Sequence, residues 1–113
     1  MFGRRKRQWE NAVATIVLVN IKRVSGDGLT PTREWVADVV RADGSIMRAR
    51  IDEPRWVTDF WPPDAGAAVK VLVESTSEEV RFDVKNDPSL SVKAQDRRKA
   101  DAFRKALSQN PSV

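Results

Sequence analysis

The sequence contains no cysteine, no histidine and no tyrosine among its 113 residues. Without cysteine there are no disulfides and no thiolate metal sites. Without histidine there is no imidazole ligand and no Cys-His or Ser-His-Asp catalytic arrangement. A general acid or base would have to be an aspartate, a glutamate or a lysine, and no recognisable constellation of these residues is present. We therefore expect a protein that is not an enzyme and that holds no metal and no cofactor.

Long hydrophobic runs are also missing. The most apolar stretch, residues 12–21, is interrupted by Thr15 and Asn20 and is shorter than the roughly 20 residues that a membrane-spanning helix needs. No small-residue cleavage site follows it, so we read no export signal. We expect a single domain that does not span a membrane and that works in the cytoplasm, a reducing compartment in which the lack of cysteine is ordinary.

Positive charge is concentrated at the two ends of the chain. The net charge is +3 over residues 1–10, −3 over residues 11–92 and +4 over residues 93–113. We expect a flexible basic arm at residues 1–11, a globular body at 12–90, a basic amphipathic helix at 91–109 and a tail at 110–113. The body therefore lacks, on average, the basic footprint of a nucleic-acid-binding domain. The cluster in the arm fits contact with phosphates or anionic lipid, or simple solvation; it consists of Arg4, Arg5, Lys6 and Arg7.

Three strands are predicted in the first half of the body. The stretch AVATIVLVNIKRV, residues 12–24, is rich in β-branched residues and apolar on both alternating sides near its middle, which predicts a strand buried on both sides. The runs REWVADVVRA and SIMRARID flank Asp43 and Gly44. Asp-Gly between two strand-like runs is typical of a two-residue type I′ hairpin turn, and such a turn would pair Ala42 with Ser45.

That hairpin register predicts two opposite faces. The face expected to join the core holds Val36, Val40, Met47, Ala49 and Ile51, with Asp38 as an exception. The other face holds Trp35, Val39, Arg41, Arg48 and Arg50. A tryptophan with three arginines is a candidate binding face, since aromatic and guanidinium groups stack on bases and contact phosphates. The alternative is a solvated face whose charges keep other strands from pairing onto it.

The segment EPRWVTDFWPPDAG, residues 53–66, predicts a short helix that closes one end of a barrel. Pro54 suits the first helical position, and Val57, Phe60 and Trp61 then share one side. Trp56 lies off this stripe and is a candidate surface contact. Strands are expected to follow at residues 68–74 and 80–84, where valines alternate with polar residues. The order β-β-β-α-β-β is that of an OB-like five-stranded barrel, so the predicted fold class is mainly β.

The end of the chain predicts an α-helix with Ser91 as its N-cap. Its apolar stripe is narrow and is surrounded by basic residues; it consists of Ala100, Phe103, Ala106 and Leu107. Phe103 and Leu107 are therefore the candidate partner-contact residues of this helix. The alternative is that the helix covers its own barrel.

Several stretches taken together resemble a known group of proteins. These are ATIVLV, the ADG hairpin, PPDAGAAVKVLVE, VRFDVKNDPSLSVKAQ and AFRKAL, spread over residues 12–107. They resemble small uncharacterised actinobacterial proteins with an OB-like β-barrel. The resemblance implies the fold and carries over no activity or binding residues.

These observations favour a protein-binding or self-associating module. Barrels of this size offer strand edges to which another chain can add, and the terminal helix offers an apolar stripe. The alternative is binding of single-stranded nucleic acid through the face of strands two and three, the surface that OB folds use for oligonucleotides. The sequence identifies no small-molecule substrate.

Overall fold

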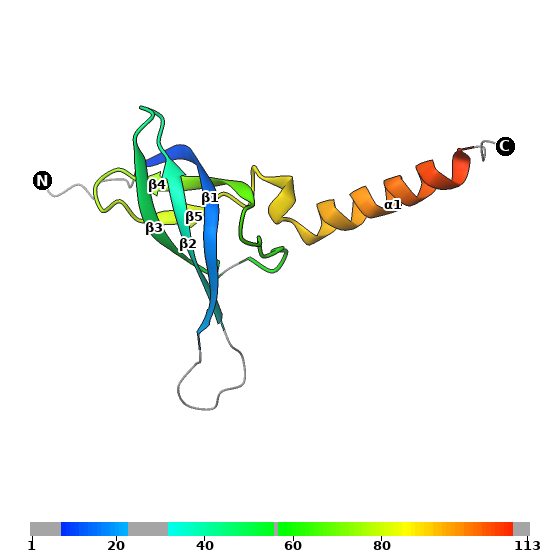
Figure 1. Cartoon of the computed structure of the whole chain (residues 1–113), viewed down its shortest axis with the longest axis horizontal. Helices are drawn as coiled ribbons and strands as arrows, with labels where there is room; N and C mark the ends of the chain where they lie inside the picture. The colour runs from blue at the N-terminus through cyan, green and yellow to red at the C-terminus, as the bar shows by residue number, and fades with distance from the viewer. Residues whose placement is uncertain (1–7, 23–31, 56, 110–113) are drawn as a thin grey trace, which may run out of the picture.

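Five strands and one long helix make up the computed structural model, which describes residues 8–22, 32–55 and 57–109 (Figure 1). The strands are β1 (Trp9–Lys22), β2 (Thr32–Val40), β3 (Ile46–Asp52), β4 (Ala68–Glu74) and β5 (Val80–Phe82). A 3-10 turn, η1 (Pro88–Leu90), and the helix α1 (Val92–Ser108) follow. The fold is therefore mainly β, as the sequence predicts.

The strands form a closed barrel in the order β1-β2-β3-β5-β4. β1 pairs with β2 along one edge and with β4 along the other, and a bulge between Ile16 and Leu18 lets it curve around the barrel. β3 and β5 run parallel and are joined at one pair, Ile51 opposite Val80. This is the predicted OB-like barrel of five strands.

The core lies inside the barrel around Trp35, which has no exposed surface. Its ring meets Phe82 at 4.9 Å and Phe60 at 5.8 Å between centroids, both edge-on. Its indole Nε1 donates a hydrogen bond of 3.0 Å to the carbonyl of Pro63, so no polar atom of this ring lacks a partner. Alternate residues of β4 also face inward, because Val69, Val71 and Val73 are buried as the alternation predicts.

The hairpin between β2 and β3 has a three-residue turn, and the predicted two-residue turn is wrong. Gly44 N donates to Arg41 O at 2.9 Å, and Arg41 N donates to Ser45 O at 2.8 Å. Only Gly44 of the Asp43-Gly44 pair has a positive φ, +87°, whereas a type I′ turn needs two such residues. The Asp43 carboxylate accepts a hydrogen bond from Ser45 N and stabilises the turn.

The longer turn shifts the pairing by one residue. Trp35 lies opposite Ile51, and Val39 lies opposite Met47. A shift of one residue moves a strand's side chains to the other face of the sheet. The core side of β2 is therefore made by Trp35, Ala37 and Val39, which are fully buried. Val36 and Val40 lie on the outer side, which corrects their assignment to the core.

No helix forms in residues 53–55 and 57–67, which the structure describes between β3 and β4. The prolines at 54, 62 and 63 leave too few residues for a stable helix. Val57 and Trp61 are each 38% exposed, so only Phe60 of the predicted plug packs against the core. The helical turn at this end of the barrel is η1, whose Leu90 is fully buried. Trp56 lies outside the described residues.

The first strand differs from its prediction in two ways. It begins at Trp9, so residues 9–11 of the predicted basic arm belong to the barrel. The guanidinium of Arg81 lies 4.7 Å above the Trp9 ring and fixes it there. In addition, the strand is buried on one side only, since Val13 is 50% and Leu18 57% exposed. In this barrel the outer side of the sheet faces solvent.

Candidate functional site

The helix α1 is held at its start by a carboxylate from a distant part of the sequence. Asp59 accepts hydrogen bonds from Ser91 Oγ at 2.7 Å, Val92 N at 2.6 Å and Lys93 N at 3.2 Å. Ser91 Oγ in turn accepts from Ala94 N at 3.1 Å, so Ser91 is the N-cap that the sequence predicts. The hydrogen bond from Ser91, with those from the two backbone N–H groups, holds the pKa of Asp59 below its ordinary value.

A second contact fixes the direction in which α1 leaves the barrel. Trp61 N donates to Leu90 O at 2.8 Å, and the ammonium of Lys99 lies 5.1 Å above the Trp61 ring. The helix therefore projects from the barrel as an arm (Figure 1). None of the 17 residues of α1, all of which the structure describes, is buried.

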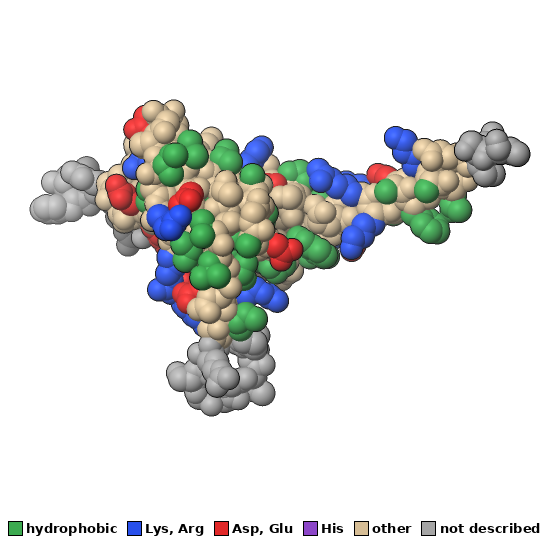
Figure 2. Space-filling model, viewed as in Figure 1, with side chains coloured by type: hydrophobic (Ala, Val, Ile, Leu, Met, Phe, Trp, Pro, Cys, Tyr) green, Lys and Arg blue, Asp and Glu red, His purple; other side chains and the backbone are tan. Residues whose placement is uncertain are grey.

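The predicted partner-contact residues lie near the free end of this arm. Phe103 is 66% exposed and Leu107 is 71% exposed. With Ala100 and Ala106 they form one apolar face, which we call the helix stripe. Basic side chains extend along the arm on either side of it (Figure 2). α1 carries six basic and two acidic residues, a net charge of +4.

The outer side of the β1–β2–β3 sheet is a second surface with exposed apolar residues. Val13 lies opposite Val40 on the neighbouring strand, and Val40 lies opposite Ile46 on the next. These three side chains, 50%, 42% and 69% exposed, form what we call the apolar row. Leu18 and Val36 pair in the same way further along the sheet. Hydrophobic side chains are also visible over the barrel in Figure 2.

Ion pairs cover the sheet between and beyond these apolar residues. Arg48 donates to both carboxylate oxygens of Asp38, at 2.8 and 3.1 Å. These hydrogen bonds lower the pKa of Asp38 and raise that of Arg48. Arg50 contacts Glu34 and Asp52, each at 3.0 Å. The arginines of this face are therefore neutralised by carboxylates of the same sheet.

The structure separates the residues of the predicted binding face. Arg48 and Arg50 lie on the outer side of β3, as the sequence predicts. Trp35 lies inside the barrel with no exposed surface, which corrects its placement beside the arginines. The cause is the register shift described above. Arg41 lies at the turn, where it is bound by two carboxylates.

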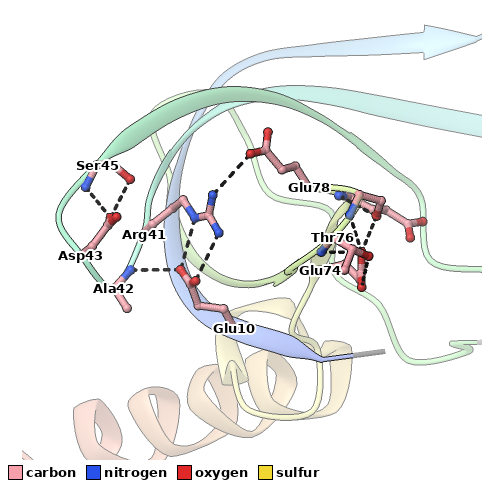
Figure 3. Close-up of polar contacts among 10 residues, drawn as sticks. Glu10, Arg41, Ala42, Asp43, Ser45, Glu74, Thr76 and Glu78 are labelled. Atoms are coloured by element: carbon pink, nitrogen blue, oxygen red, sulfur yellow. Dashed lines mark hydrogen bonds and ion pairs between the residues drawn. The ribbon is translucent and has the colours of Figure 1, made fainter. Parts of the chain in front are cut away.

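Arg41 joins the β2–β3 turn to β1 and to the loop after β4 (Figure 3). Its Nη2 lies 3.3 Å from Glu10 and its Nη1 lies 3.6 Å from Glu78. Glu10 also accepts from Ala42 N at 3.2 Å. The side-chain hydrogen bond from Arg41 is the main reason why the pKa of Glu10 is lowered. Arg41 therefore has a structural contact network on this side of the barrel.

The buried carboxylate of Glu74 organises the turn between β4 and β5. It is 3% exposed and accepts from both the N–H and the hydroxyl of Thr76 and of Ser77, at 2.6–3.1 Å (Figure 3 labels Thr76). These hydrogen bonds, with those from Ser77 the largest, lower the pKa of Glu74 to about 2. Every donor comes from the same turn, so Glu74 is a structural residue.

Glu74→Gln is expected to lower the melting temperature at neutral pH and to reduce the loss of stability in acid. The folded-state pKa of about 2 lies below the ordinary value of 4.5, so the carboxylate stabilises fully above about pH 4.5 and loses this effect as the pH falls toward 2. Melting curves of both proteins from pH 7 to pH 2 should therefore converge. A gap in melting temperature that stays constant over this range would contradict the assignment.

A groove of about 1010 Å³ runs along β3 and β5, where a single pair joins the two strands. Met47, Ala49 and Phe82 line it together with charged residues. Its described lining holds five basic and five acidic side chains. This balance gives the groove no preference for a ligand of either charge.

The remaining predictions concern chemistry and location. Among the described residues, no group of three or more acidic side chains is placed to hold a metal ion. Nor does any helix in the described part of the chain have the length and apolar character needed to cross a membrane. The basic cluster Arg4, Arg5, Lys6 and Arg7, like the tail at 110–113, lies outside the described residues.

Comparison of the chain with protein-family models, with curated proteins and with solved structures finds no match. The resemblance to small actinobacterial β-barrel proteins therefore stays a prediction.

Asp59 is the site residue that sequence reasoning missed. It lies within the predicted plug helix, and the residues around it give no sign of a contact with α1. Its contact with Ser91 spans 32 residues, which no local pattern shows.

Proposed function

We propose that the protein is a non-enzymatic, protein-binding or self-associating module that uses α1 as its contact element. One observation carries the proposal: a helix fixed to the barrel at its start has no buried residue and leaves Phe103 and Leu107 exposed. Burying side chains of this size contributes about 1.5–3 kcal/mol each. A helix of this kind gains most of its stability when its apolar face packs against another surface.

The charge of α1 indicates the kind of surface that it fits. Its net charge of +4 favours a partner that presents carboxylates around an apolar site. Such pairing raises the rate of encounter and disfavours basic partners. In this proposal the module works in the cytoplasm, which the absence of cysteine fits.

Binding of single-stranded nucleic acid stays the alternative. Arg48 and Arg50 are on the outer side of β3, where that function would need them. However, the stacking residue of this hypothesis, Trp35, lies inside the barrel, and both arginines contact carboxylates. The helix therefore supports protein binding better than the sheet supports nucleic-acid binding.

The test is photo-crosslinking in cells that express the full chain. A photoreactive phenylalanine analogue replaces Phe103 in one variant and Arg50 in another. We expect the first variant to give discrete protein adducts, because position 103 lies in the helix stripe. The analogue at Lys105, on the opposite side of α1, is the matched control and should give far fewer adducts.

Two results would count against the proposal. Equal labelling from positions 103 and 105 would mean that the helix stripe has no specific partner. Nuclease-sensitive adducts from position 50, with none from position 103, would favour the nucleic-acid alternative instead.

A further inference from the structure

We infer that the partner of α1 is a second copy of this chain, and that the helix of each copy lies on the outer side of the β1–β2–β3 sheet of the other. The inference rests on the proposed use of α1 as a contact element and names its partner. Three properties of the described residues support it: an apolar receiving surface, two surfaces of similar length, and opposite net charges of the helix and the barrel.

The receiving surface is the apolar row, with Leu18 and Val36 beyond it. Large exposed apolar side chains are concentrated on this sheet and on α1. The outer side of the sheet contributes Val13, Leu18, Val40 and Ile46, and the helix contributes Phe103 and Leu107. The two surfaces that would gain most from leaving water thus belong to the same chain.

The two surfaces have similar lengths. Along β2, Val40 and Val36 are four residues apart, which corresponds to about 13 Å. Along α1, Ala100 and Leu107 are seven residues apart, which corresponds to about 10 Å. The helix stripe therefore covers most of the distance between the apolar row and the Leu18 and Val36 pair.

The net charges of the helix and of the barrel as a whole are opposite. The described barrel residues, 8–22, 32–55 and 57–91, include nine basic and thirteen acidic side chains, a net charge of −4. The helix carries +4. On the sheet itself, the charged side chains of the outer side pair with one another, as Arg48 does with Asp38. Association of two copies therefore brings a basic helix toward an acidic barrel.

The direction of α1 favours a contact between copies over one within a copy. The hydrogen bonds of Asp59 and the contact of Lys99 with Trp61 point the helix away from its own barrel. A two-fold arrangement repeats the same helix-on-sheet contact twice. An anionic lipid surface or a nucleic acid would match the helix charge but would leave the apolar row uncovered, so the observations favour a second copy.

Sedimentation velocity of the full chain tests the inference. We expect the mass to rise from one copy to two between about 1 µM and 1 mM, with weaker association at high salt.

Phe103→Glu with Leu107→Glu and, separately, Val13→Lys with Ile46→Lys should each weaken association at least about tenfold. All four residues are exposed, so both variants should keep the wild-type barrel, which circular dichroism checks. Ala102→Glu with Ser108→Glu adds the same charge beside the helix stripe and should weaken association much less.

Mixing the two defective variants distinguishes this contact from others. The intact helix of the sheet variant can still lie on the intact sheet of the helix variant, and the introduced Glu and Lys side chains attract one another at the other contact. We expect the mixture to form dimers that neither variant forms alone. Dimers of the sheet variant by itself would indicate a helix-to-helix contact and overturn the inference.

A chain that stays a single copy at all concentrations would also overturn it. The proposed function would still stand if crosslinking from position 103 then gave adducts with another protein. The two proposals therefore fail under different results.

Discussion

Trp35→Ala is expected to lower the free energy of unfolding by about 3–5 kcal/mol. The side chain has no exposed surface and contacts Phe60 and Phe82 edge-on. Its removal leaves a cavity at the centre of the barrel. It also removes the hydrogen bond that the Pro63 carbonyl accepts from the indole N–H. Urea unfolding followed by far-ultraviolet circular dichroism measures the change.

Trp61→Ala is the matched control, because it removes the same side chain from a position that is 38% exposed. It should cost about 1 kcal/mol or less. Trp35→Phe keeps an aromatic ring in place, so its free energy of unfolding should lie between those of the wild type and Trp35→Ala. This variant provides the measurement if the alanine variant does not fold. Equal effects of Trp35→Ala and Trp61→Ala would contradict the register of the β2–β3 hairpin.

Leu90→Ala is expected to lower the free energy of unfolding by about 2–5 kcal/mol. Leu90 belongs to η1 and is fully buried at the end of the barrel. Truncating it leaves a void beside the core. Thermal and urea unfolding of the full chain measure the loss.

Phe103→Ala is the comparison for Leu90→Ala. It removes a larger side chain from a position that is 66% exposed, so it should change the stability of a dilute single copy by no more than about 0.5 kcal/mol. If the two substitutions had the same effect, η1 would not close the barrel.

The hairpin between β2 and β3 shows why a fold can be predicted while a surface is not. The prediction relied on the Asp43-Gly44 turn, and the turn had one residue more than expected. The alternation of β2 was the better guide, because Trp35, Ala37 and Val39 are apolar at every second position. Asp38 on the predicted core side was a sign of the wrong register. The error left the strand order intact and changed only which side chains reach the surface.

Local chemistry predicted other elements well. The alternating valines of β4 and the capping residue Ser91 depend on neighbours within a few residues, and the structure places them as predicted. The burial of Phe60 and the role of Asp59 depend on groups about twenty to thirty residues away. The direction of α1 follows from these distant contacts, and periodicity along the chain carries no information about them.

The pairing of β1 with β4 also determines when the barrel can close. Trp9 pairs with Glu74 and Thr15 with Ala68, so this edge of β1 has no partner until β4 has been synthesised. Pairings between residues this distant in sequence form slowly, because the loop between them must close first. β1, β2 and β3 can pair through shorter loops as they leave the ribosome. Until residues 68–74 follow, the inner side of this sheet, with Trp35 at its centre, has no opposite wall, and a nascent chain stalled before that point would expose its most apolar surface.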